Sequence, residues 1–290
     1  MSARRTAAGR RAAGRSLTGE GNLFEALQFE FMRNALIAGL LTSIACGIIG
    51  SLVVVNRIVF ISGGVAHASF GGIGLAFFLG ISPLLGASVF ALAVAMIIGA
   101  ITLKNRERSD TIIGALWAVG MAIGIILIDM TPGYNADLMS YLFGSIIAVS
   151  RPDIVLMIIL DAVIVLTVTY YFKDFLALSF DGEYAALRGT PVKLLHFLLL
   201  GLVALTVVMT IRVVGLILVI ALLTIPTYIA EKIAGSLLKM MVIAVLLAAV
   251  FTFTGLWLSF ILNITSGASI IMVGAAAFFL FHIYRLLKTA

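Results

Sequence analysis

Long apolar segments separated by short polar ones run through most of the chain. The longest segments without Asp, Glu, Lys or Arg lie at 58–103 and 240–284, and each is long enough for two passes of a bilayer. A membrane-spanning helix needs about 20 consecutive apolar residues. The pattern predicts eight or nine spans, because the Gly-rich second segment leaves open whether it crosses fully. The predicted positions are 34–55, 61–80, 83–103, 111–130, 153–172, 193–211, 213–230, 240–262 and 267–287.

The fold class follows from the length of these segments. Membrane β-barrels show alternation over stretches of about ten residues, and this chain does not. We therefore expect an all-α, polytopic transmembrane helix bundle that forms one permease-sized domain over 23–290. Residues 1–22 are rich in Arg, Ala and Gly and predict a disordered tail. An interfacial helix is expected over 23–33, and a half-helix at one surface over 137–149.

Composition and charge agree with this picture. The chain is 62% hydrophobic and 11% charged, whereas soluble domains carry about 25% charged residues. The net charge of +6 does not indicate nucleic acid binding, because the basic residues lie in short loops, where they set membrane orientation. The single cysteine, Cys46, lies in an apolar span and is interpreted as a packing residue.

The basic loops predict which face is cytoplasmic. If nine spans alternate, most basic residues outside the N-terminal tail fall on one side of the membrane. An odd number of spans then puts the Arg-rich N-terminus on the opposite side, against the usual rule. The residues that define the basic face are Arg57, Lys104, Arg106, Arg108, Lys173, Arg188, Lys193, Lys232, Lys239, Arg285 and Lys288.

Several motifs of catalysis are missing from the sequence. It contains no G-x-x-x-x-G-K-[ST] phosphate loop, no H-E-x-x-H, no C-x-x-C and no G-x-S-x-G. We therefore expect a transporter and not an enzyme, with no bound cofactor. A metal-ion channel or secondary transporter without an ATPase is the alternative, but such proteins show more intramembrane charge or an inverted repeat.

The stretch 179–193, SFDGEYAALRGTPVK, predicts a short helix on the basic face. Asp and Gly begin it, Gly189 can cap its C-terminus, and Pro191 prevents continuation. One interpretation is a solvated connector between two spans, and the other is a docking helix for a cytoplasmic partner, at about 179–190. The candidate coupling residues are Asp181, Gly182, Glu183, Ala186, Leu187 and Gly189.

One histidine lies within the second predicted span. His67 is flanked at helical spacing by Gly63 and Gly71, so the predicted helix has little side-chain volume above and below the imidazole. Small residues allow close helix packing, and they also leave room for an ion beside the ring. Imidazole is a good ligand for zinc and similar metals, so both a packing role and a metal ligand are open.

The motifs together resemble those of one transporter family. The stretch SFDGEYAALRG resembles a coupling helix, and NRIVFISGGVAHASFGGIGLAFFLG, DLMSYLFGSIIAVSRPD and VVGLILVIALLTIPTYIA resemble motifs of the zinc/manganese-type ABC metal importer permeases, in the family's order. The resemblance covers about residues 30 to 287. It implies two permease copies around a metal path, cytoplasmic ATPase subunits that hydrolyse ATP, and an extracytoplasmic metal-binding protein. It also implies that His67 contacts the transported zinc or manganese.

The chain departs from that family at one position. Many members have Asp four residues before the histidine, where this chain has Gly63. Losing a hard oxygen ligand favours zinc over manganese, because manganese prefers oxygen ligands more strongly.

Other ionisable residues receive weaker predictions. Asp129 and Asp137 are expected at the surface, and His196 and His282 at the cytoplasmic interface. The role of Asp161, in the middle of a predicted span, stays open between function and a local hydrogen bond.

Overall fold

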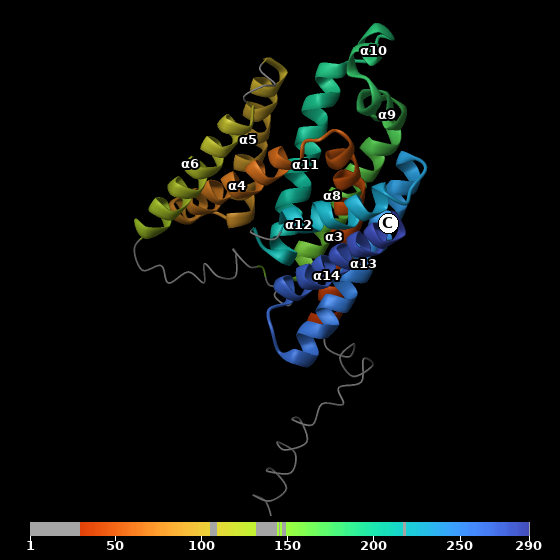
Figure 1. Ribbon diagram of the computed structural model, residues 1–290. Coiled ribbons are helices and arrows are strands. Elements are labelled where there is room, and N and C mark those ends of the chain that lie inside the picture. Colours follow the sequence, from red (N-terminus) through yellow and green to blue (C-terminus); the bar gives the residue numbers. More distant parts are fainter. Residues whose placement is uncertain are drawn as a thin grey trace, which may run out of the picture.

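The computed structural model describes residues 30–104, 109–131, 144, 146, 149–216 and 219–289 (Figure 1). Helices and their connections account for these residues, and no strand occurs among them, which confirms the predicted all-α bundle. The predicted tail at 1–22, residues 23–29 of the predicted interfacial helix and most of the half-helix at 137–149 lie outside the described residues, and residues 30–33 form the start of α3. The helices are α3 Glu30–Val55, α4 Val59–Leu79, α5 Pro83–Lys104, α6 Ser109–Asp129, α8 Arg151–Tyr170, α9 Phe172–Phe180, α10 Gly182–Leu187, α11 Val192–Val214, α12 Val219–Glu231, α13 Leu237–Leu262 and α14 Ser266–Thr289.

Eight of the described helices are long and apolar enough to cross a membrane, so the protein is an integral membrane protein. They correspond to eight of the nine predicted spans. The prediction of a full span at 213–230 is wrong, because α12 has only 13 residues. The physical reason lies in the turn before it. Helix α11 continues to Val214 and stops at Gly215, whose φ of 87° is favourable only for glycine.

Helix α12 still runs in the direction expected of a crossing segment. Tyr228 of α12 and Phe278 of α14 have ring centroids 5.3 Å apart, and Ile225 lies against Gly274. Residue numbers increase in the same direction along both helices, so α12 is parallel to α14. It is antiparallel to α13, as Figure 1 also shows. Pro226 inside α12 cannot donate a backbone hydrogen bond.

The directions of the helices still place the start of α3 on the side opposite the predicted basic face. Gly39 of α3 faces Thr252 of α13, and Gly47 faces Val245, so α3 and α13 are antiparallel. Helix α14 runs back along α13, which makes α3 and α14 parallel (Figure 1). Glu30, where α3 begins, therefore lies at the opposite end of the bundle from the end of α14.

Glycines let α4 pack unusually close to its neighbours. A side chain at Gly74 would overlap the backbone of Gly124 on α6, and a side chain at Gly72 would overlap that of Gly86 on α5. Small residues at such crossings are typical of membrane helix packing. Helix α4 is consequently the most enclosed of the spanning helices.

Helix α11 separates two apolar cores. Leu199 and Val207 belong to the larger core with α3, α8 and α12, whereas the adjacent residues Leu200 and Val208 belong to the core with α4, α5 and α6. Helix α11 thus contributes residues to both cores.

Candidate metal path and coupling helix

His67 lies in the middle of α4 and is held by an aromatic stack. Its ring is buried and lies on the indole of Trp117 from α6, with centroids 3.9 Å apart and an interplanar angle of 12°. The Trp117 Nε1–H donates to Met121 Sδ at 3.2 Å, which fixes the indole. Nitrogen lone pairs of imidazole lie in the ring plane, so stacking on one face leaves the ring edge free for a ligand.

The edge of this imidazole carries an unsatisfied atom. Within the described part of the chain, His67 Nδ1 is buried and has no hydrogen-bond partner. Buried polar atoms are nearly always paired, and an exception calls for an explanation such as a bound ion. A neutral imidazole nitrogen can coordinate a transition metal.

The glycines around His67 do not leave the open space that the sequence suggested. Gly71, one turn further on, lies against the Gly120 carbonyl oxygen and the ring of Phe90, and Gly64 lies against Ile113. Close packing of α4 explains these glycines. Gly63, in contrast, lines a pocket.

This open pocket has a volume of about 480 Å³ and lies between α3, α4, α6 and α12. Gly63, one turn before His67, lines it, and so does Trp117, whose indole covers one face of the histidine. Position 63, where the family resemblance led us to expect a carboxylate, therefore lines an open pocket one helical turn from the histidine. The lining consists of Val54, Arg57, Val59, Phe60, Gly63, Trp117 and Ile220.

His67 is a single ligand and not a complete metal site. No group of three or more His, Cys, Asp or Glu side chains in metal-binding positions occurs among the residues described above. The arrangement can offer one imidazole nitrogen to a passing ion.

The predicted coupling segment forms the short helix α10. Asp181 caps its start, and the Oδ1 atom accepts hydrogen bonds from the backbone N–H groups of Glu183 at 2.9 Å and Tyr184 at 3.1 Å. Gly189 follows its end with φ of 83°. The sequence therefore predicted both ends of this helix correctly.

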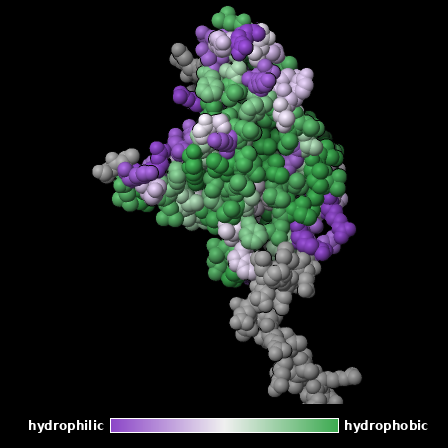
Figure 2. Space-filling view, turned by 90° about the vertical axis from the view of Figure 1, so that its right-hand side faces the viewer, coloured by the Kyte–Doolittle hydropathy of each residue, from purple (hydrophilic) through white to green (hydrophobic). Residues whose placement is uncertain are grey.

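Helix α10 lies beyond the end of the bundle, above α9 and α11 (Figure 1). Figure 2 shows hydrophobic side chains covering the middle of the molecule, and hydrophilic ones gathered at this upper end. Leu187 is nevertheless 87% exposed, and Ala186 next to it is also exposed. Ala185 is fully buried, so it anchors α10 to the bundle.

Sequence reasoning missed two exposed aromatic residues of this region. Phe180, at the end of α9, is 83% exposed, and Tyr184 of α10 is 55% exposed. Helix α9 itself was not predicted, because Lys173 and Asp174 in its first turn indicated a polar connection after the predicted span at 153–172. Large apolar residues flanking an Asp-Gly helix start were the signal that could have identified them.

The remaining ionisable candidates separate into two groups. Asp129 is exposed at the end of α6, as predicted, and Asp137 lies outside the described residues. His196 is partly buried, with Nε2 3.1 Å from Thr102 Oγ1, and His282 is exposed beside Phe278. Asp161 alone is a buried carboxyl in the middle of a span.

Comparison with known proteins places this geometry in a family. Residues 28–285 match the model of the "ABC 3 transport family". An uncharacterized membrane protein of Synechocystis sp. is 51% identical over 91% of this chain and 94% of its own length. The manganese transport system membrane protein MntC of Listeria monocytogenes is 34% identical over 89% of this chain and 92% of its own length.

A solved structure is similar along the same length. The structure titled "PsaBC from Streptococcus pneumoniae in complex with Fab" matches with a TM-score of 0.81 and 34% identity, over 89% of this chain and 93% of that one. The family match covers nearly all of the described helices, including α4 and α10. The chain therefore belongs to the ABC 3 transport family and is a membrane permease, not an enzyme.

Proposed function

We propose that this chain is the permease subunit of an ATP-driven importer of divalent transition metal ions, with zinc preferred over manganese. The observation that carries the proposal is the buried, unpartnered Nδ1 of His67 beside a cavity, in a chain that belongs to this transport family. Membership in the family argues against the alternative of a channel or secondary transporter.

The choice between the two metals rests on the donor atoms. A relative named for manganese transport supports a metal of this class. The family resemblance leads us to expect a carboxylate at position 63, but this chain has Gly63 there, which leaves the nitrogen of His67 as the side-chain donor of this helix face. Zinc accepts nitrogen ligands in low coordination number, whereas manganese prefers several oxygen ligands.

The other subunits of the importer follow from what this chain lacks. It has no phosphate loop, so ATP must be hydrolysed by a separate cytoplasmic ATPase. We assign α10 as the helix that docks on that ATPase, with Asp181, Gly182 and Gly189 setting its ends and Glu183, Ala186 and Leu187 on its surface. A second copy of the chain and an extracytoplasmic metal-binding protein complete the assembly.

The role of His67 can be tested by uptake into proteoliposomes that contain the permease, its ATPase and the binding protein. Zinc uptake is measured with manganese as competitor. The His67→Phe variant keeps an aromatic ring on Trp117 but has no ligand nitrogen, so its zinc uptake should fall at least tenfold while ATPase binding is retained. The His67→Ala variant removes both the ring and the ligand.

The two variants separate ligation from packing. A ligand role predicts that both lose uptake. If stacking on Trp117 were the whole role of His67, His67→Phe would transport zinc normally and only His67→Ala would have a lower melting temperature. That second pattern would remove His67 from the metal path.

A further inference from the structure

A second group of buried polar side chains lies where α3, α8 and α11 meet. Asp161 of α8 is only 6% exposed, and both of its carboxyl oxygens are buried without a hydrogen-bond partner in the described part of the molecule. Thr42 of α3 is fully buried, and its Oγ1 likewise lacks a partner there. Unpaired buried polar groups on two neighbouring helices indicate a missing ligand more strongly than either group alone.

The thiol of Cys46 belongs to the same group. It lies one helical turn after Thr42, and its Sγ is 3.3 Å from Thr210 Oγ1 on α11. The Thr210 hydroxyl donates its single proton to the Thr206 carbonyl oxygen at 2.6 Å. The Cys46 thiol must therefore donate the hydrogen bond to Thr210 Oγ1. When the thiol loses its proton, a lone pair of Thr210 Oγ1 becomes available to a metal ion.

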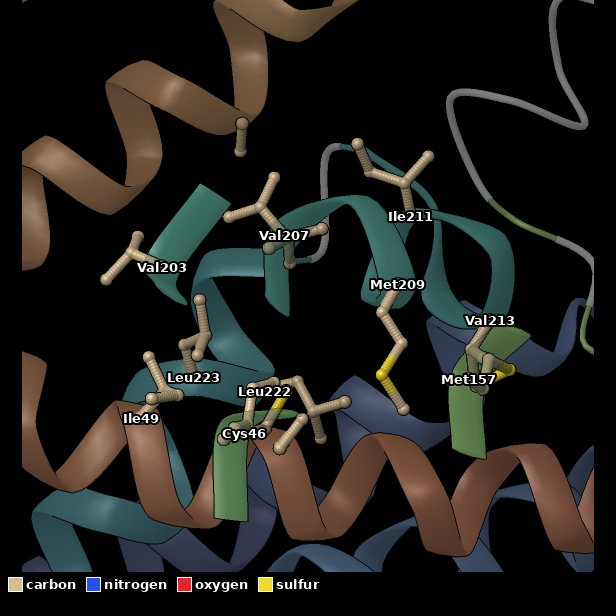
Figure 3. Packing of buried hydrophobic residues seen from close by; sticks show 14 of the residues in the cluster. Cys46, Ile49, Met157, Val203, Val207, Met209, Ile211, Val213, Leu222 and Leu223 are labelled. Carbon is tan, nitrogen blue, oxygen red and sulfur yellow. The ribbon is translucent and has the colours of Figure 1, made fainter. Parts of the chain in front are cut away.

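Asp161 faces this group from α8. The salt bridge of Arg151 with Glu30 at 2.7 Å joins the starts of α8 and α3, and Asn56, just after α3, donates to Ser179 of α9, beyond the end of α8, at 2.9 Å. The two helices therefore run in the same direction, with their middles at about the same level. Helix α8, which carries Asp161, packs directly on α3, which carries Cys46, and the charge of an Asp161 carboxylate would act on the Cys46 thiol. Figure 3 shows Cys46 on α3 within the apolar core that also contains Met157, one turn before Asp161, and Met209.

An apolar environment makes an isolated carboxylate unfavourable, and a bound cation removes that penalty. We propose that Asp161, Cys46, Thr42 and Thr210 bind one divalent cation of the zinc class within each protomer, separate from His67. The carboxyl and the thiol release two protons, one metal–oxygen and one metal–sulfur bond form, and the two negative charges balance the cation. The two hydroxyl oxygens complete four donors, a number that suits zinc.

Cobalt absorption tests this site directly, because the chain has only one cysteine. Full-length permease in detergent, in a His67→Ala background, is stripped of metal and titrated with Co²⁺. A near-ultraviolet thiolate-to-cobalt charge-transfer band should appear and saturate at one Co²⁺ per protomer. Zn²⁺ should then displace the cobalt and remove the band.

Conservative variants identify the ligands. Cys46→Ser, which keeps a donor for Thr210, should abolish the band, and Asp161→Asn should weaken Co²⁺ binding at least tenfold. If Asp161→Asn does not fold, Thr42→Val, which keeps the side-chain shape, should weaken binding several-fold. Absence of the band in the parent protein, or an unchanged titration in both Asp161→Asn and Thr42→Val, would overturn the site. Neither result depends on metal uptake through His67.

Discussion

The orientation of the His67 imidazole is set by residues outside its own helix. Trp117 covers one ring face, and Met121 holds Trp117 through its indole N–H. The ring edge is thereby fixed relative to the cavity lined by Gly63. Metal preference on this helix face should then depend on what occupies position 63.

The residue-scale prediction is that Gly63→Asp shifts the permease toward manganese. The added carboxylate supplies a hard oxygen ligand one turn from His67, so the ratio of manganese to zinc uptake should rise about tenfold, which corresponds to about 1.4 kcal/mol. The new Cβ would lie 2.7 Å from Ile220 Cδ1, the end of a side chain that can rotate. Competition between the two metals in proteoliposomes measures the shift.

Gly63→Ala is the matched control, because it makes the same contact with Ile220 without adding a ligand. Its metal preference should equal that of the parent chain. An equal shift in both variants would show that the cavity responds to volume and not to donor chemistry.

At the scale of elements, α10 depends on its two ends. A six-residue helix has few internal hydrogen bonds and is unstable by itself. Asp181 satisfies two backbone N–H groups at its start, and Gly189 turns the chain after its end. Buried Ala185 attaches it to the bundle. Small changes at these positions should therefore act on docking and leave insertion intact.

Gly189→Ala should weaken ATPase binding by about five- to thirtyfold. The φ of 83° is left-handed, and a residue with Cβ costs roughly 1–2 kcal/mol in that conformation. No atom lies within 4 Å of the position that the new Cβ would occupy, so crowding does not contribute. Affinity of the ATPase for the detergent-solubilised permease measures the effect.

Gly189→Asn provides the comparison, because asparagine tolerates the left-handed region better than other residues with a side chain. It should retain most of the ATPase affinity. Equal ATPase affinity of the parent chain, Gly189→Ala and Gly189→Asn would mean that docking does not depend on the left-handed turn after α10. That result would argue against the docking role of α10.

At the scale of the whole molecule, the parallel course of α3 and α14 puts the two ends of the described chain at opposite ends of the bundle. Arg188, which follows α10, and Lys288 in the final turn of α14 then share one side. Glu30, paired with Arg151, lies on the other.

Cysteine labelling in a Cys46→Ser background tests this topology. Cysteine at Leu187 should react only with reagents applied from the cytoplasm, and cysteine at Asp129 only with reagents applied from outside. Cysteine at Glu30 should behave like Asp129. If the cysteines introduced at Glu30 and Leu187 were labelled from the same side, the chain would cross the membrane an even number of times between these two positions.

The sequence by itself determined the membrane class, the approximate ends of eight spans and the caps of α10. These features depend on local properties: segment length against bilayer thickness, an Asp side chain at a helix start, and a glycine at a left-handed residue. The family could also be identified from the order of short motifs. None of these properties requires knowing which helices are neighbours.

Only the tertiary structure decided what surrounds the polar residues. The sequence suggested space around His67, but α5 and α6 pack into most of its glycines, and the Trp117 indole that covers its ring comes from a different helix. Asp161 had no assigned partner in the sequence, and the structure packs its helix α8 in parallel against α3, which carries Thr42 and Cys46. Both environments arise from contacts between distant segments, which hydrophobic periodicity along one helix does not specify.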